Sequence, residues 1–134
     1  MTSPQEHYKN FKQFQEDINE KIRANLLLER QKIIGFTVSE ASTNLLEYYF
    51  HKLNLISPGF QVNHNFFSSE KRAERMLDFE FPLKTKIIPI LVKIEELRDL
   101  LCYGKEKKVD KVQEGLTALQ KMKELISQKL GEEL

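Results

Sequence analysis

The sequence predicts an all-α protein that folds as an antiparallel bundle of four to five helices. Apolar residues recur at spacings of three and four in four long stretches, which is the pattern of helices with one buried face. No stretch shows the apolar and polar alternation of a strand, and helices with a single apolar stripe are most simply satisfied in a bundle. A chain of 134 residues matches one ordinary domain, so we expect residues 1–134 to form a single α-helical bundle domain.

The first predicted helix covers residues 4–24. Ser3 followed by Pro4 is a typical helix start, because serine caps the free amides and proline suits the first helical position. The helix is expected to end near Ala24, since three consecutive leucines follow and the apolar face shifts there.

The second predicted helix covers residues 27–54 and contains Gly35. A glycine inside a helix costs about 1 kcal/mol relative to alanine, so we expect it to mark the close approach of a neighbouring helix or a slight bend. The sequence Ser57-Pro58-Gly59 ends this helix.

The longest predicted loop follows and runs to Ser69. It holds His64 beside Phe66 and Phe67. Loops with aromatic and polar groups can be functional, but the phenylalanines can also simply anchor the loop to the core. A short helix over residues 70–79 comes next.

The stretch from Pro82 to Gly104 is the predicted helix that carries most information. At about 100° per residue, Arg98 lies about 40° from Ile94 and so projects beside the apolar stripe, where it needs a partner. The stripe comprises Ile87, Ile90, Ile94, Leu97 and Leu101. Three acidic residues are expected on the outer face: Glu95, Glu96 and Asp99. A last amphipathic helix follows over residues 109–130, closed by Gly131.

Composition narrows the functional classes. The net charge of +1 predicts neither a strongly basic nucleic-acid binder nor an acidic protein, so any basic site must be local. Cys102 is the only cysteine, which excludes an intrachain disulfide and fits a reducing compartment. No long apolar run or export signal is present, so we expect a cytoplasmic protein that does not span a membrane.

The sequence lacks the residue patterns that metal binding, nucleophilic catalysis and phosphate-loop binding require. The three histidines are scattered and no cysteine pair exists, so we expect no metal site. No nucleophile signature surrounds Cys102, and the five glycines are isolated rather than grouped in a phosphate-binding loop. We therefore expect no cofactor.

The six residues Arg98 to Tyr103, RDLLCY, resemble the R-x4-6-H motif of HEPN domains. Arg98 matches the motif arginine and Asp99 the polar residue after it, whereas Tyr103 stands where that family has histidine. The order of two long helices, a loop with NHNFFSSEKRAER and a final helix is also similar to HEPN-like chains, loosely over residues 30–130.

The resemblance implies a small helical bundle acting as a dimer. Many HEPN members are metal-independent ribonucleases, often toxins paired with a small nucleotidyltransferase, and others bind RNA or protein without catalysis. A tyrosine hydroxyl is a much weaker base than an imidazole near neutral pH, so Tyr103 puts ribonuclease activity in doubt. His64 can substitute only if its loop folds over the end of the helix that carries Arg98.

Two interpretations of Arg98 remain open. It either binds phosphate or RNA, or covers the core with its stem and pairs with a glutamate of another helix. A lysine cluster that includes Lys105, Lys107 and Lys108 is likewise either a solvated turn or a small phosphate-attracting patch. Tyr103 is either part of the site or a packed aromatic at the helix end.

The sequence is compatible with three candidate functions. The first is a HEPN-like protein, catalytically weakened or silent, associated with RNA or with a toxin-antitoxin partner of the nucleotidyltransferase type. The second is a helical protein-interaction module, and the third is a metal-independent ribonuclease that uses Arg98 with His64 or Tyr103. A homodimer is expected because the aromatic residues exceed what one core should hold: Tyr8, Phe11, Phe14, Tyr48, Tyr49, Phe50, Phe79 and Phe81.

Overall fold

The computed structural model describes residues 3–134, and within that part of the chain every regular element is a helix. Five α-helices are joined by connections that include one short 3₁₀ helix, η1. In chain order they are α1 (Pro4–Arg23), α2 (Gln31–Lys52), η1 (His64–Ser68), α3 (Glu70–Met76), α4 (Lys84–Cys102) and α5 (Val109–Leu130). The predicted all-α class is therefore confirmed.

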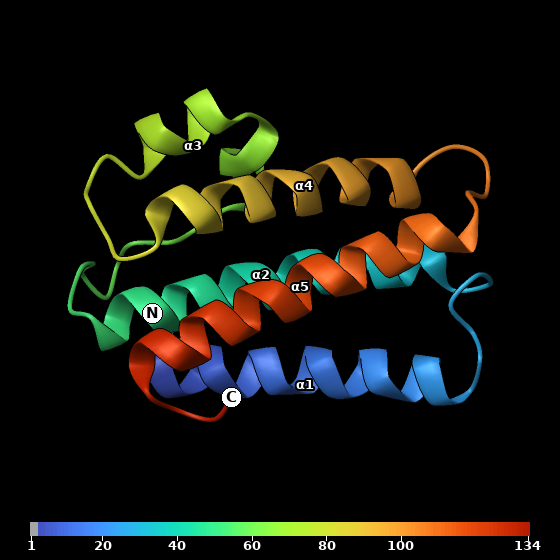
Figure 1. The fold of residues 1–134 in the computed structure, drawn as a ribbon, viewed down its shortest axis with the longest axis horizontal. Coiled ribbons are helices and arrows are strands. Elements are labelled where there is room, and N and C mark those ends of the chain that lie inside the picture. The colour runs from blue at the N-terminus through green and yellow to red at the C-terminus, as the bar shows by residue number, and fades with distance from the viewer. Residues whose placement is uncertain (1–2) are drawn as a thin grey trace.

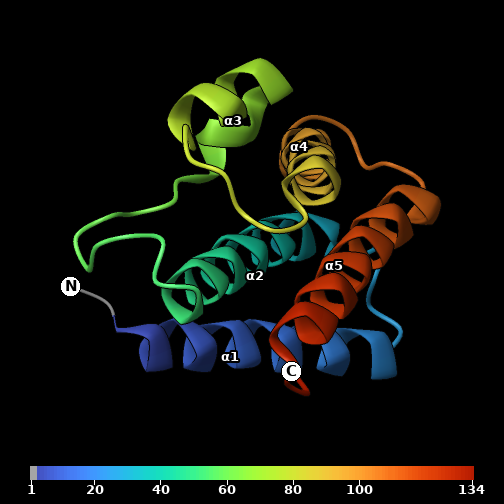
Figure 2. The same cartoon turned by 60° about the vertical axis from the view of Figure 1, so that its left-hand side comes forward.

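Four long helices form the body of the molecule. In Figure 1, α1, α2, α4 and α5 lie along the long axis, and successive long helices run in opposite directions. Helix α2 is central, because it contacts α1, α4 and α5. Figure 2 shows that the axes are splayed, since α4 is seen nearly end-on while α1 lies across the view. Helix α3 and η1 pack on α4, on the side away from α1.

Capping residues account for the helix ends that were predicted well. The Ser3 hydroxyl accepts a hydrogen bond from the Glu6 amide at 3.1 Å and begins α1. The Ser69 hydroxyl accepts one from the Arg72 amide at 3.0 Å and begins α3. Gly131 ends α5 in the left-handed conformation, with φ of 68°.

The predicted bounds of the second helix, 27–54, are wrong at both ends. Helix α2 begins at Gln31 and ends at Lys52. Asn54 adopts a φ of 56°, a left-handed conformation that asparagine tolerates and that a helix cannot continue through, so α2 ends before it. Residues 27–30, which the prediction included in this helix, form turns before α2.

Two other bounds also differ from the prediction. The loop expected before Ser69 contains η1, which the Asn63 side chain caps by accepting from the Asn65 amide at 3.0 Å. Helix α4 begins at Lys84 rather than at Pro82, because Leu83 has a φ of 67°.

The short helix α3 ends at Met76 rather than at residue 79. Phe79 leaves the helix and meets the Phe50 ring edge-on, with 5.1 Å between the ring centres. Aromatic packing therefore takes the place of the expected last turn.

The aromatic residues that suggested a dimer interface lie in or against one core. Phe11, Tyr49 and Phe50 are fully buried, and the other five of the eight are buried or packed against the same cluster. This reason for expecting a dimer therefore does not hold, and the homodimer stays a prediction.

None of the helices within residues 3–134 combines the length and the apolar character that crossing a membrane requires.

Candidate functional site

Arg98 lies on α4, three residues before Leu101, and its guanidinium rests on an aromatic ring of α2. Its guanidinium carbon is 5.8 Å from the centre of the Phe36 ring, a distance at which a cation is attracted by the ring face. Phe36 itself is 45% exposed. The Arg98 Nε is buried and has no hydrogen-bond partner within residues 3–134, where no ion pair includes this residue. The interpretation that Arg98 pairs with a glutamate of another helix is therefore wrong.

His64 reaches α4, but through Glu95. The His64 Nδ1 is 2.6 Å from the nearer Glu95 carboxylate oxygen, and the Glu95 side chain is only 7% exposed. The expectation that Glu95 faces outward is wrong, because η1 covers that face of α4. Ile88 and Leu91 precede Glu95 by seven and four residues and are also buried, so this second apolar stripe was a signal in the sequence that Glu95 would be covered.

Tyr103 follows α4 directly and points into solvent, with 64% of its surface exposed. Among residues 3–134, no hydrogen bond or ion pair joins Arg98 to Tyr103 or to His64. The structure therefore brings His64 to the helix that carries Arg98 but shows no direct contact among the three predicted catalytic residues.

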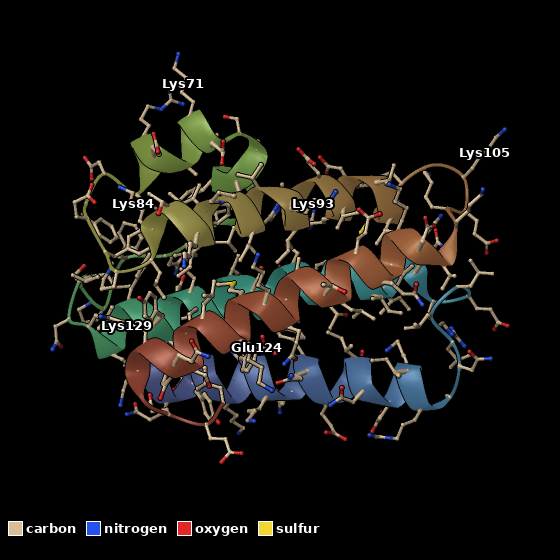
Figure 3. The ribbon with its side chains drawn as sticks, viewed as in Figure 1. Lys71, Lys84, Lys93, Lys105, Glu124 and Lys129 are labelled. Carbon is tan, nitrogen blue, oxygen red and sulfur yellow. The ribbon has the colours of Figure 1, made fainter. Side chains whose placement is uncertain are left out.

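The lysine turn is fastened to the start of α2 by Gln31. The Gln31 amide donates to the Lys107 carbonyl at 2.9 Å, and its oxygen accepts from the Lys107 amide at 2.7 Å. The Lys107 ammonium folds back onto the turn and donates a hydrogen bond to the Lys105 carbonyl. Lys105 and Lys108 are exposed, and Figure 3 shows Lys105 extending from the end of the molecule. The sequence did not indicate this role of Gln31, because nothing in the neighbouring residues distinguishes it from other polar residues.

Exposed large apolar side chains are carried by several segments at this same end of the molecule. They come from the end of α1, the connection to α2, the start of α2, the end of α4 and the start of α5, segments that meet at one end in Figure 1. We call these seven residues the apolar end: Ile22, Leu28, Ile33, Phe36, Leu100, Tyr103 and Val109.

A buried polar cluster that the sequence did not reveal joins α1 to α2. The His7 Nδ1 donates to the Asn44 side-chain oxygen at 2.9 Å, because the Asn44 amide nitrogen is directed to the Glu40 carbonyl. The His7 Nε2 forms an ion pair with Glu47, whose other oxygen accepts from the Val62 amide. Burial raises the pKa of Glu47, partly offset by the Val62 amide and by His7.

A polar cavity of about 170 Å³ lies beside this cluster and is lined by His7 and Glu47, among others. His7 and Glu47 contact one another and bond to Asn44 and to the Val62 amide, so we interpret this cluster as a structural junction between α1 and α2. Within residues 3–134, no three His, Cys, Asp or Glu side chains are placed together to hold a metal ion.

Cys102 does not have the surroundings of a nucleophile. Its thiol donates to the Lys32 carbonyl at 3.4 Å. Burial raises the pKa of the thiol, and Arg98 offsets this only in part, so the reactive thiolate is disfavoured.

The fold and the site define a class, namely an all-helical protein with an exposed apolar end next to an arginine stacked on an aromatic ring. No protein-family model, no curated protein and no solved structure matches this chain. The HEPN resemblance therefore stays a prediction.

Proposed function

We propose that the protein is a HEPN-like, non-enzymatic binding protein that engages another protein through the apolar end. The observation that carries this proposal is that all seven exposed large apolar side chains of residues 3–134 come from segments that meet at one end of the molecule. Exposed apolar residues scattered singly are ordinary, whereas their grouping within a polar surround is typical of interaction sites.

A second copy of the chain is the partner that the surrounding charges favour. Basic and acidic residues alternate around the apolar end, with Arg30 next to Glu29 and Lys105 next to Glu106. A two-fold pairing can place such opposite charges across from one another. A nucleotidyltransferase-type protein, implied by the HEPN resemblance, is the alternative partner.

Sedimentation velocity at micromolar concentration tests this proposal. We expect the wild type to sediment as a dimer, and Ile33→Glu or Leu100→Glu as a monomer of 15.8 kDa, because a charge would be buried at the interface. Both side chains are exposed in one chain, so circular dichroism should show an unchanged helix content. Gln128→Glu, an exposed position near the far end of α5, is the matched control. A wild type that stays monomeric would exclude the second copy as partner.

Single-stranded RNA is a second candidate ligand, favoured by the Arg98 and Phe36 pair. An exposed ring, a cation above it and nearby lysines are the groups on which unpaired bases stack and phosphates bind. Tyr103 offers a second exposed ring at the same end. The mixed charge around these residues makes this candidate weaker than a protein partner.

Fluorescence anisotropy with a labelled single-stranded RNA at low salt tests the RNA candidate. Arg98→Ala should weaken binding and reduce its dependence on salt, while Tyr103→Phe should change little because the ring is kept. Arg98→Ala should lose less than about 2 kcal/mol of stability, since no ion pair is broken. Lys129→Ala on the distant end of α5 is the control. If wild-type binding is undetectable at low salt, the RNA candidate is excluded.

The same RNA samples test a metal-independent ribonuclease. The Glu95 contact holds His64 Nδ1, and within residues 3–134 no hydrogen bond involves Nε2, an orientation that suits a base. Cleavage in the presence of EDTA that His64→Gln abolishes would support this third candidate, and intact RNA would exclude it.

A further inference from the structure

A groove between α4 and α5 is distinct from the apolar end. It has a volume of about 650 Å³ and a mainly apolar lining. Pro89 and Ile90 of α4 and Ala118 and Leu125 of α5 form its apolar part. It uses the first half of α4, whereas the apolar end uses the last turn of that helix.

Lysines stand on both walls of the groove. Lys86 and Lys93 come from α4 and Lys121 from α5, and Figure 3 labels Lys93 on the part of α4 that runs beside α5. The one acidic residue in the lining, Glu114, is already neutralised by Lys93 at 3.0 Å and by Lys111 at 3.1 Å. The groove therefore presents a net positive rim around an apolar floor.

The length of the groove suits a helix. Its α4 wall extends from Thr85 to Lys93 and its α5 wall from Glu114 to Leu125, which at 1.5 Å per residue are about 12 and about 16 Å. These lengths correspond to between two and three helical turns.

We propose that this groove binds an amphipathic helix of a partner protein, with acidic residues on both sides of its apolar stripe. The apolar stripe lies on Pro89, Ile90, Ala118 and Leu125, and the acidic residues pair with Lys86 on one wall and Lys121 on the other. This is the helix-in-groove mode of recognition. A fatty acid would fill the floor but has one carboxylate, which can meet only one wall.

Fluorescence anisotropy with a labelled synthetic peptide tests the proposal. The probe is a helical peptide of two heptads with a leucine stripe flanked by glutamates. A scrambled peptide of the same composition and a peptide with lysines in place of the glutamates are the controls. We expect the glutamate peptide to bind and both control peptides to bind much more weakly.

Charge reversal in the protein locates the binding. The double variant Lys86→Glu with Lys121→Glu should bind the glutamate peptide about tenfold more weakly and should gain binding to the lysine peptide. Both lysines are exposed, and neither takes part in an ion pair within residues 3–134. The control variant Lys105→Glu with Lys108→Glu, at the apolar end, should bind as the wild type does.

Three results would overturn the proposal. One is equal binding of the glutamate peptide and its scrambled form. Another is a loss of binding in the Lys105→Glu with Lys108→Glu variant, which would place the peptide at the apolar end. The third is an amide chemical-shift change at groove residues with dodecanoate but not with the peptide, which would make the groove a site for a small amphiphile.

Discussion

Gly35 lies where α2 packs tightly against α4. A Cβ built on Gly35 would be 2.9 Å from the Leu101 Cβ, which is shorter than a normal contact between two carbons. Leu101 itself is buried and its Cβ is fixed to the α4 backbone, so a side chain at residue 35 can be accommodated only by moving one helix. The glycine therefore sets the distance between the two helices.

Gly35→Ala should destabilise the protein by up to about 2 kcal/mol, because the usual cost of overpacking, about 1 to 3 kcal/mol, is offset by a gain of about 1 kcal/mol in helix propensity. Urea denaturation followed by circular dichroism measures the change in the free energy of unfolding.

Gly115→Ala is the matched control for the Gly35 variant. A Cβ at residue 115 would meet only the Leu97 Cδ1, at an ordinary 3.8 Å. This variant should be unchanged or more stable, because only the propensity gain remains. An equal effect of the two substitutions on the free energy of unfolding would contradict the conclusion that Gly35 is needed for the close contact with Leu101.

At the scale of elements, the joint between α1 and α2 contains groups that respond to pH. The His7 and His51 rings stack with 5.9 Å between their centres, and the buried Nε2 of His51 has no hydrogen-bond partner within residues 3–134. Burial lowers the pKa of His51, and His7 lowers it further. In the unfolded chain this pKa returns to about 6.5, so protons bind the unfolded chain more tightly at this residue.

We expect acidification to weaken the α1–α2 joint through His51. Its contribution to stability is complete above pH of about 6.5 and is lost as pH falls toward the lowered pKa of the folded state. Glu47, whose pKa burial raises, acts in the opposite direction: its contribution is present at low pH and is lost as pH rises. The effect of His51 must therefore be measured as a difference.

Urea denaturation of the wild type and of His51→Gln between pH of about 8 and about 5 gives this difference. The free energy of unfolding of the wild type should fall relative to that of the variant as pH drops below about 6.5. A difference that is constant over the whole range would contradict the assignment of His51.

At the scale of the whole molecule, one core connects all five α-helices. Phe11 of α1, Leu45 of α2, Ala73 of α3, Ile94 of α4 and Met122 of α5 belong to the same buried cluster. No part of residues 3–134 has a separate core, so the helices should lose their packing together.

Thermal unfolding should therefore be a single cooperative transition. Far-ultraviolet circular dichroism reports the helices, and tyrosine absorbance reports the core through Tyr48 and Tyr49, which are both buried. The two midpoints should coincide. Separate midpoints would contradict the expectation that residues 1–134 form one domain.

The sequence by itself determined the helical class and most helix ends, because these depend on neighbouring residues. The spacing of apolar residues predicted α1, α4 and α5, and the caps Ser3, Ser69 and Gly131 act within one turn of the chain. Gly35 was also identified as a position of close helix approach before any partner was known. Of the candidate site, only residues on or beside α4 could be proposed in this way.

Tertiary structure alone decided which of these residues meet. Gln31 holds Lys107 across 76 positions of the chain, and His64 meets Glu95 across 31. The 3₁₀ helix η1 covers a face of α4 that periodicity assigned to solvent, and segments from five places in the chain form the apolar end. Local patterns show which face of a helix is apolar. Which residues cover that face depends on packing between segments distant in sequence, because folding reduces the apolar area exposed to water over the whole chain.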